Sequence, residues 1–86
     1  MEIKNYANMF KAIGDETRLL ILKVLISNEE VCACKLLEKV NCNQSTLSHH
    51  MKILVDSGLV IARKDWKWVH YSANREKINI LINSLN

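Results

Sequence analysis

Two cysteines separated by a single residue, Cys32-Ala33-Cys34, carry the most distinctive chemistry of the sequence. Thiolates are soft ligands that select soft or borderline metal ions and metalloids. By itself such a pair is also compatible with two small residues of a core, so the pattern alone leaves both roles open. Cys42 is the only other cysteine; it lies in the turn Asn41-Cys42-Asn43, and we expect a small, buried turn residue there rather than a third ligand.

A second group of polar residues shares one face of a helix predicted from about Gln44 to Ser57. At about 100° per residue, this face lies opposite the apolar side chains of Leu47, Met51 and Leu54. Short, nearly uncharged polar side chains suit hydrogen bonds to base edges and phosphates, whereas helices exposed only to water usually carry Glu and Lys pairs. His50 adjoins the apolar stripe and is predicted to be structural. The predicted DNA contacts on this helix are Gln44, Ser45, Thr46, Ser48, His49 and Lys52.

Basic residues follow this helix, between two runs rich in β-forming residues, Leu59–Ala62 and Trp68–Tyr71. The two runs predict a hairpin with the basic residues at or near its tip, where they can reach phosphates or the adjacent minor groove. Residues 43–86 hold six Lys and Arg against three Asp and Glu, whereas residues 1–42 hold six of each. Trp68 and Tyr71 are predicted to pack within the hairpin. The predicted DNA contacts of the hairpin are Arg63, Lys64 and Lys67.

The remaining elements are helices that position these two groups. Gly14 ends a first amphipathic helix, and Asp15 is a good N-cap for a second, apolar helix through Ser27. A short third helix from about Ala33 to Val40 and the helix from Gln44 form a helix-turn-helix. The predicted order is α-α-α-α-β-β-α, mainly α with a small β-hairpin, in one winged helix-turn-helix domain spanning residues 1–86.

Two apolar stripes predict a homodimer. A chain of 86 residues buries a limited core, and both terminal helices carry apolar residues at helical spacing. Two-fold symmetry would impose an inverted repeat on the DNA site. No apolar run reaches the length of a signal peptide or a membrane span, so we expect a cytoplasmic protein without a membrane partner. The predicted interface residues are Tyr6, Met9, Phe10, Ile13, Ile78, Leu81, Ile82 and Leu85.

The sequence resembles the ArsR/SmtB family of metal- and metalloid-responsive repressors over nearly its whole length. The resemblance is carried by residues 15–18 (DETR), 31–36 (VCACKL), 44–54 (QSTLSHHMKIL) and 57–60 (SGLV). It implies a dimeric winged-helix repressor with the first and last helices in the dimer interface and the fourth helix in the major groove. It also places Cys32 and Cys34 where the subgroup sensing arsenite, antimonite, cadmium or lead keeps its thiolates.

The sequence departs from the family pattern at three places. The predicted wing turn, Asp65-Trp66-Lys67, lacks the glycine that the family commonly uses. The last helix lacks the Asp and His that bind zinc in some members. Leu37 occupies the position at which some arsenic sensors have a further cysteine.

These observations predict a repressor of double-stranded operator DNA that a thiophilic effector releases, with As(III) or Sb(III) favoured and Cd(II) or Pb(II) possible. No obligatory cofactor and no small-molecule substrate are expected, and no nucleophile–base pattern or Gly-rich phosphate loop suggests an enzyme. Two alternatives stay open. The cysteine pair could sense oxidation by forming a disulfide, or the winged helix could serve only as a protein-interaction module.

The spacing of the two thiols also restricts their geometry. Residues two apart on an α-helix point about 200° away from each other, so Cys32 and Cys34 cannot face one ion from a regular helix. Either Cys32 lies outside the helix at its cap, or binding unwinds the first turn of the helix.

Overall fold

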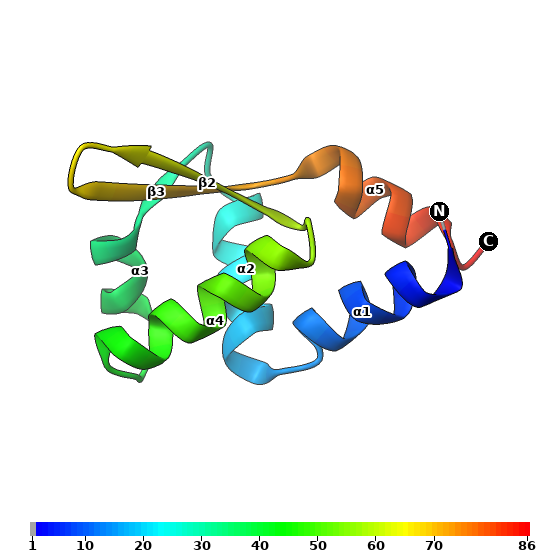
Figure 1. Ribbon diagram of the computed structural model, residues 1–86, viewed down its shortest axis with the longest axis horizontal. Helices are drawn as coiled ribbons and strands as arrows, with labels where there is room; N and C mark the ends of the chain where they lie inside the picture. Colours follow the sequence, from blue (N-terminus) through cyan, green and yellow to red (C-terminus); the bar gives the residue numbers. More distant parts are fainter. Residues whose placement is uncertain (1) are drawn as a thin grey trace.

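The computed structural model describes residues 2–86, in which five helices and a three-stranded sheet form an elongated domain of 38 × 22 × 20 Å (Figure 1). The order of the predicted elements is confirmed, with one short strand added before the third helix. No helix of residues 2–86 is long and apolar enough to cross a membrane. The elements are α1 Ile3–Ile13, α2 Glu16–Ile26, β1 Val31–Cys32, α3 Ala33–Lys39, α4 Gln44–Asp56, β2 Val60–Asp65, β3 Trp68–Ala73 and α5 Arg75–Asn83.

Short polar side chains cap the first turns of three helices: Asp15 for α2, Asn43 for α4 and Asn74 for α5. The Asp15 carboxylate accepts a hydrogen bond from the backbone N–H of Arg18, which caps α2 as the sequence predicts. Asn43 caps α4 in the same way by accepting from the backbone N–H of Thr46 at 2.8 Å. Each cap satisfies a backbone donor that has no partner within its own helix.

Gly58 ends the α4 segment with φ +86°, in the left-handed region that favours glycine. The next two residues, Leu59 and Val60, are fully buried, so the chain turns directly from the end of α4 into the sheet. Gly58 therefore sets the direction in which the hairpin leaves α4.

The buried side chains form two clusters of unequal size. The larger one joins α2, α3, α4 and the sheet, and its fully buried members include Ile21, Leu25, Leu36 and Leu54. The smaller one consists of Met9, Leu59 and Leu81, which hold α1 against α5. Figure 1 shows the two clusters' elements at different ends, with α1, α5 and both termini at one end and α3 and the hairpin turn at the other.

The sheet has the order β1-β3-β2, with both pairs antiparallel. β1 was not predicted, because two residues paired to a distant strand leave no periodic pattern in the sequence. The hairpin is also longer than predicted: β2 continues through Asp65, so Arg63 and Lys64 belong to the strand and not to its tip. Trp66, with φ +58°, takes the left-handed place that a glycine would commonly fill.

Candidate DNA-binding surface and thiol site

One face of α4 presents the polar residues that the sequence assigns to DNA. The opposite face is anchored in the larger cluster by Leu47, Met51 and Leu54. This division confirms the predicted amphipathic helix. Lys52 donates to Asp56 one turn later at 3.1 Å, an exposed pair that leaves the ammonium at the surface. The exposed residues of this face of α4, called the reading face after its predicted role, are Gln44, Ser45, Thr46, Ser48, His49 and Lys52.

His50 has a structural role, as predicted. Its Nδ1 lies 3.0 Å from Nη1 of Arg18, and the same guanidinium donates to the backbone oxygen of Ala12 at 2.6 Å. Asp15 lies beside this pair, and the backbone N–H of Arg18 holds the pKa of its carboxyl below the usual range. The cluster ties the junction of α1 and α2 to the middle of the reading helix.

The wing tip combines a cation with two aromatic rings. The Lys67 ammonium lies 5.0 Å from the ring centre of Trp66 and 5.2 Å from that of Trp68, within the range of cation–π attraction. Trp66 is 79% exposed and Trp68 52% exposed. Tyr71 packs against the larger cluster as predicted, whereas Trp68 is more exposed than predicted. The tip therefore offers both positive charge and flat apolar surface to a ligand.

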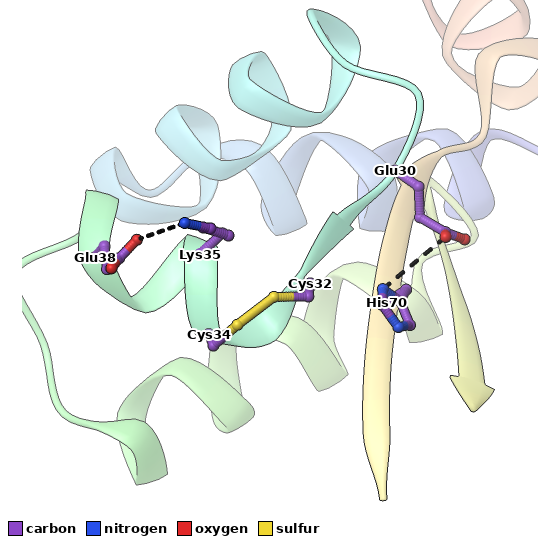
Figure 2. Close-up of a disulfide and its surroundings, with 6 residues drawn as sticks. All are labelled: Glu30, Cys32, Cys34, Lys35, Glu38 and His70. Carbon is purple, nitrogen blue, oxygen red and sulfur yellow. Dashed lines mark ion pairs between the residues drawn. A yellow bond between two sulfur atoms is a disulfide. The ribbon is translucent and has the colours of Figure 1, made fainter. Parts of the chain in front are cut away.

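Arg63 is held within the protein by an ion pair that the sequence did not suggest. Its Nε and Nη2 donate to the two carboxylate oxygens of Glu30 at 2.9 and 2.8 Å. His70, opposite Arg63 in the sheet, has its Nδ1 3.9 Å from the same carboxylate (Figure 2). The hydrogen bonds from Arg63 hold the pKa of Glu30 below its usual range, so the carboxylate stays charged at neutral pH.

The two predicted thiols meet at the start of α3. Cys32 is the N-cap of α3 with extended backbone, whereas Cys34 is the second residue of the helix. Their Cα atoms are 5.4 Å apart and their sulfur atoms are joined as a disulfide (Figure 2). Of the two geometries that the spacing allowed, the structure has the first, with Cys32 outside the helix.

Cys42 remains a free thiol that packs against the larger hydrophobic cluster. Within residues 2–86, no group of three His, Cys, Asp or Glu side chains is arranged to hold a metal ion. The thiol site of this structure therefore consists of Cys32 and Cys34, and Cys42 is a half-buried turn residue outside it.

A groove of about 330 Å³ connects the thiols to the candidate DNA-binding surface. One wall is formed by the cysteine pair and α3, another by α4, and a third by β3. Gln44 and Ser48 of α4 and Lys67 of the wing are among the residues that line it. The sequence did not predict the groove, because its walls come from three separate segments spread over residues 32–71.

The residues assigned to a dimer interface divide into two groups. The protomer buries Met9 and Leu81 in its own smaller cluster, with Tyr6, Ile13 and Ile78 packed beside them. Phe10, Ile82 and Leu85 are exposed, Ile82 at 61% and Leu85 at 77%. The exposed group is the part of the prediction that remains accessible to a second copy.

Comparisons with known proteins agree with this architecture. Residues 15–62 match the family described as bacterial regulatory protein, arsR family. The chain is 42% identical to an uncharacterised HTH-type transcriptional regulator of Methanocaldococcus jannaschii, over 88% of this chain and 85% of that protein. It is 44% identical to an arsenical resistance operon repressor of Staphylococcus aureus, over all of this chain and 82% of that protein.

A solved structure matches the fold over almost the whole chain. HlyU from Vibrio cholerae superposes with a TM-score of 0.81 at 32% identity, covering 99% of this chain and 94% of that one. The sequence match to the family includes α2, β1, α3 and α4, the segments that carry the thiol pair and the reading helix. The chain therefore belongs to the arsR family of bacterial regulatory proteins, winged helix-turn-helix transcriptional regulators rather than enzymes.

Proposed function

We propose that this protein represses transcription as a homodimer on a palindromic operator and that a thiophilic effector releases it by binding Cys32 and Cys34. Arsenite or antimonite is favoured, with cadmium or lead as further candidates. The observation that carries the proposal is the meeting of two thiols at the start of α3, on a groove that reaches the reading helix. The name of the Staphylococcus aureus relative supports an arsenical as effector.

DNA binding would follow from symmetry and from the reading face. Two copies related by a two-fold axis present two α4 helices, which requires half-sites about one helical turn apart. In each copy α4 would enter the major groove with Gln44, Ser48 and His49, while Lys64 and Lys67 of the wing contact phosphates. The exposed apolar residues of α1 and α5 supply the surface on which two protomers would meet.

Effector binding would act through the packing of α3. Leu36 of α3 shares the larger cluster with Leu47 and Met51 of α4, so a shift of the first turn of α3 is transmitted to the reading helix. A change in the spacing of two α4 helices lowers affinity for a fixed pair of half-sites. A coupling free energy of about 1–3 kcal/mol is sufficient for useful derepression.

The chemistry requires the reduced cysteines. A cellular thiol reductant first opens the disulfide by transferring two electrons. Arsenite, As(OH)₃, then exchanges two hydroxyl groups for the two sulfur atoms, and the two thiol protons leave with the hydroxyls as two water molecules. Arsenic remains trivalent throughout this exchange, so no oxidant is needed.

The test is operator binding by fluorescence anisotropy, with and without arsenite, in a phosphine reductant. Cys32→Ser and Cys34→Ser should leave operator affinity nearly unchanged and abolish release. Cys42→Ser is the matched control, because it removes the half-buried thiol outside the pair, and it should respond as the wild type does. Normal release of the Cys32→Ser, Cys34→Ser double variant would refute the thiol-sensor proposal.

A second candidate function rests on the disulfide itself. If Cys32 and Cys34 sense oxidation, hydrogen peroxide would take two electrons and two protons from the thiols and leave a disulfide and two water molecules. Operator release by peroxide in the absence of arsenite, reversed by a phosphine, would favour this function. Release by arsenite under reducing conditions and none by peroxide would favour the metalloid sensor.

A further inference from the structure

We propose that the groove beside Cys32 and Cys34 receives the organic substituent of a monosubstituted trivalent arsenical, so that the site selects R–As(III) compounds over inorganic arsenite. This inference rests on the proposed thiol function and names the class of effector. The wall of the groove next to the thiols is mainly apolar. Its apolar side chains are Leu37, Leu47, Met51, Trp68, Val69 and Tyr71.

The valence of arsenic leaves one position to fill. Trivalent arsenic makes three bonds, and the cysteine pair supplies two of them. Neither Cys42 nor any carboxylate or imidazole lines the groove among residues 2–86. In arsenite the third substituent is a hydroxyl, which loses hydrogen bonds to water when it faces apolar walls. In R–As(OH)₂ it is a carbon group, which gains from leaving water.

The size of the groove suits a ring. A volume of about 330 Å³ exceeds what a methyl group fills and lies at the lower end of the range for small-molecule sites. Trp68 and Tyr71 contribute aromatic surface to the same groove, against which an aryl group can stack at an offset or edge to face. We therefore take the phenyl compound as the probe.

The exchange reaction balances without a change of oxidation state. Phenylarsine oxide hydrates to C₆H₅–As(OH)₂, whose two hydroxyl groups are replaced by the sulfur atoms of Cys32 and Cys34. The thiol protons leave with the hydroxyls as two water molecules. The thiols are obtained from the disulfide with a water-soluble phosphine, which takes up the oxygen of one water molecule and becomes a phosphine oxide.

Such a substituent would lie next to the DNA-reading residues. Gln44 and Ser48 of α4 and Lys67 of the wing help to line the groove, so a bound aryl group stands between α4 and the wing. Release by an organic arsenical would then include direct displacement of these side chains, in addition to the shift of α3.

The experiment compares binding of phenylarsine oxide and arsenite to the reduced protein, each in competition with dithiothreitol. Competition with a free dithiol cancels the general preference of either arsenical for paired thiols. For each arsenical the measured quantity is the ratio of its affinity for the protein to its affinity for dithiothreitol. We expect this ratio to be at least tenfold greater for phenylarsine oxide than for arsenite. Equal ratios for the two compounds would overturn the proposal.

Variants of the groove test its role directly. Val69→Phe should fill the groove and remove the preference for the phenyl compound while arsenite binding is retained. Ile61→Phe is the matched control, an exposed apolar residue of β2 that does not line the groove, and it should keep the preference. Trp68→Ala removes a half-exposed wall and provides a second test that does not disturb the core; it should also lower the preference. If the preference for phenylarsine oxide is unchanged in both Val69→Phe and Trp68→Ala, the groove does not receive the organic substituent.

Binding and release separate the two proposals. If phenylarsine oxide binds preferentially and neither arsenical releases the operator, the selectivity of the groove stands and the sensor function fails. If both arsenicals give equal ratios and release the operator, the sensor function stands and the groove proposal fails.

Discussion

The two ends of this elongated protein expose apolar side chains in different surroundings. At the α1–α5 end, Ile82 and Leu85 are exposed beside a cluster of only three buried residues. At the wing end, Trp66 and Trp68 are exposed around the Lys67 ammonium. Exposed apolar surface is typical of an interface between protein copies, whereas aromatic surface combined with a cation suits a polyanion. We therefore propose assembly at the α1–α5 end and DNA contact at the wing end.

The largest expected effect comes from a charge at the α1–α5 end. Ile82→Asp should convert the proposed dimer to a monomer and lower operator affinity at least 100-fold, about 2.8 kcal/mol, because one protomer binds one half-site alone. Sedimentation at micromolar concentration gives the mass, and anisotropy gives the affinity. Trp66→Asp is the control at the opposite end, and it should leave the mass of the dimer unchanged. A wild type that sediments as a monomer with and without operator would contradict the assignment.

The next effect separates base reading from phosphate contact at the wing end. Ser48→Ala or His49→Ala should cost about 1–3 kcal/mol on the operator and relax the preference for particular base pairs. Lys64→Ala or Lys67→Ala should weaken binding to all sequences alike and reduce the slope of log K against log salt by about 1. Titrations on operator and random duplex at several salt concentrations measure both. Equal losses on the two DNAs for Ser48→Ala would show that this face does not read bases.

The sequence predicts well those elements that are determined by residues close together along the chain. Asp15 is recognisable as a capping residue, and α2 and α4 lie close to their predicted ranges. The burial of Leu47 and the exposure of Ser48 follow from helical spacing alone. Each of these features is decided within one or two turns of chain, which is the distance over which periodicity carries information.

Features that join distant segments could not be predicted in the same way. β1 exists because Val31 and Cys32 pair with β3, about 40 residues later. The ion pair of Glu30 with Arg63 depends on the same pairing, and so does the groove beside the thiols. Trp66 adopts a left-handed turn without glycine, so the usual sequence signal for a tight hairpin is absent. The spacing of Cys32 and Cys34 identified the thiol pair, but it did not reveal which residues of α4 and β3 surround the pair in the fold.

A smaller effect compares the helix caps at the two ends. Asn43→Ala and Asn74→Ala each remove a side chain that accepts from a backbone N–H at the start of a helix, α4 and α5 respectively. Each should lower the free energy of unfolding by about 1 kcal/mol, measured by urea denaturation. Only Asn43→Ala should also weaken DNA binding of the folded protein, because the first turn of α4 carries Gln44 and Ser45. If both variants weaken DNA binding equally, the separation of the two ends is wrong.

The smallest expected effect concerns Arg63, which the sequence assigned to DNA and the structure pairs with Glu30. The hydrogen bonds from Arg63 lower the pKa of Glu30, so the stabilisation from this pair is complete above the carboxyl's unfolded pKa and is lost as pH falls through the folded one. At neutral pH the guanidinium is therefore engaged within the protein.

Glu30→Gln removes the charge that holds the Arg63 guanidinium and should allow Arg63 to bind a phosphate. This contact should steepen the slope of log K against log salt on random duplex by up to about 0.9. Glu29→Gln is the matched control, because it removes an equal charge one residue away. If both variants steepen the slope equally, the effect is one of net charge and Arg63 makes no phosphate contact. If Glu30→Gln alone steepens it, and Glu30→Gln, Arg63→Gln restores the original slope, then Glu30 limits the DNA contacts of the wing from a position two residues before the thiol pair.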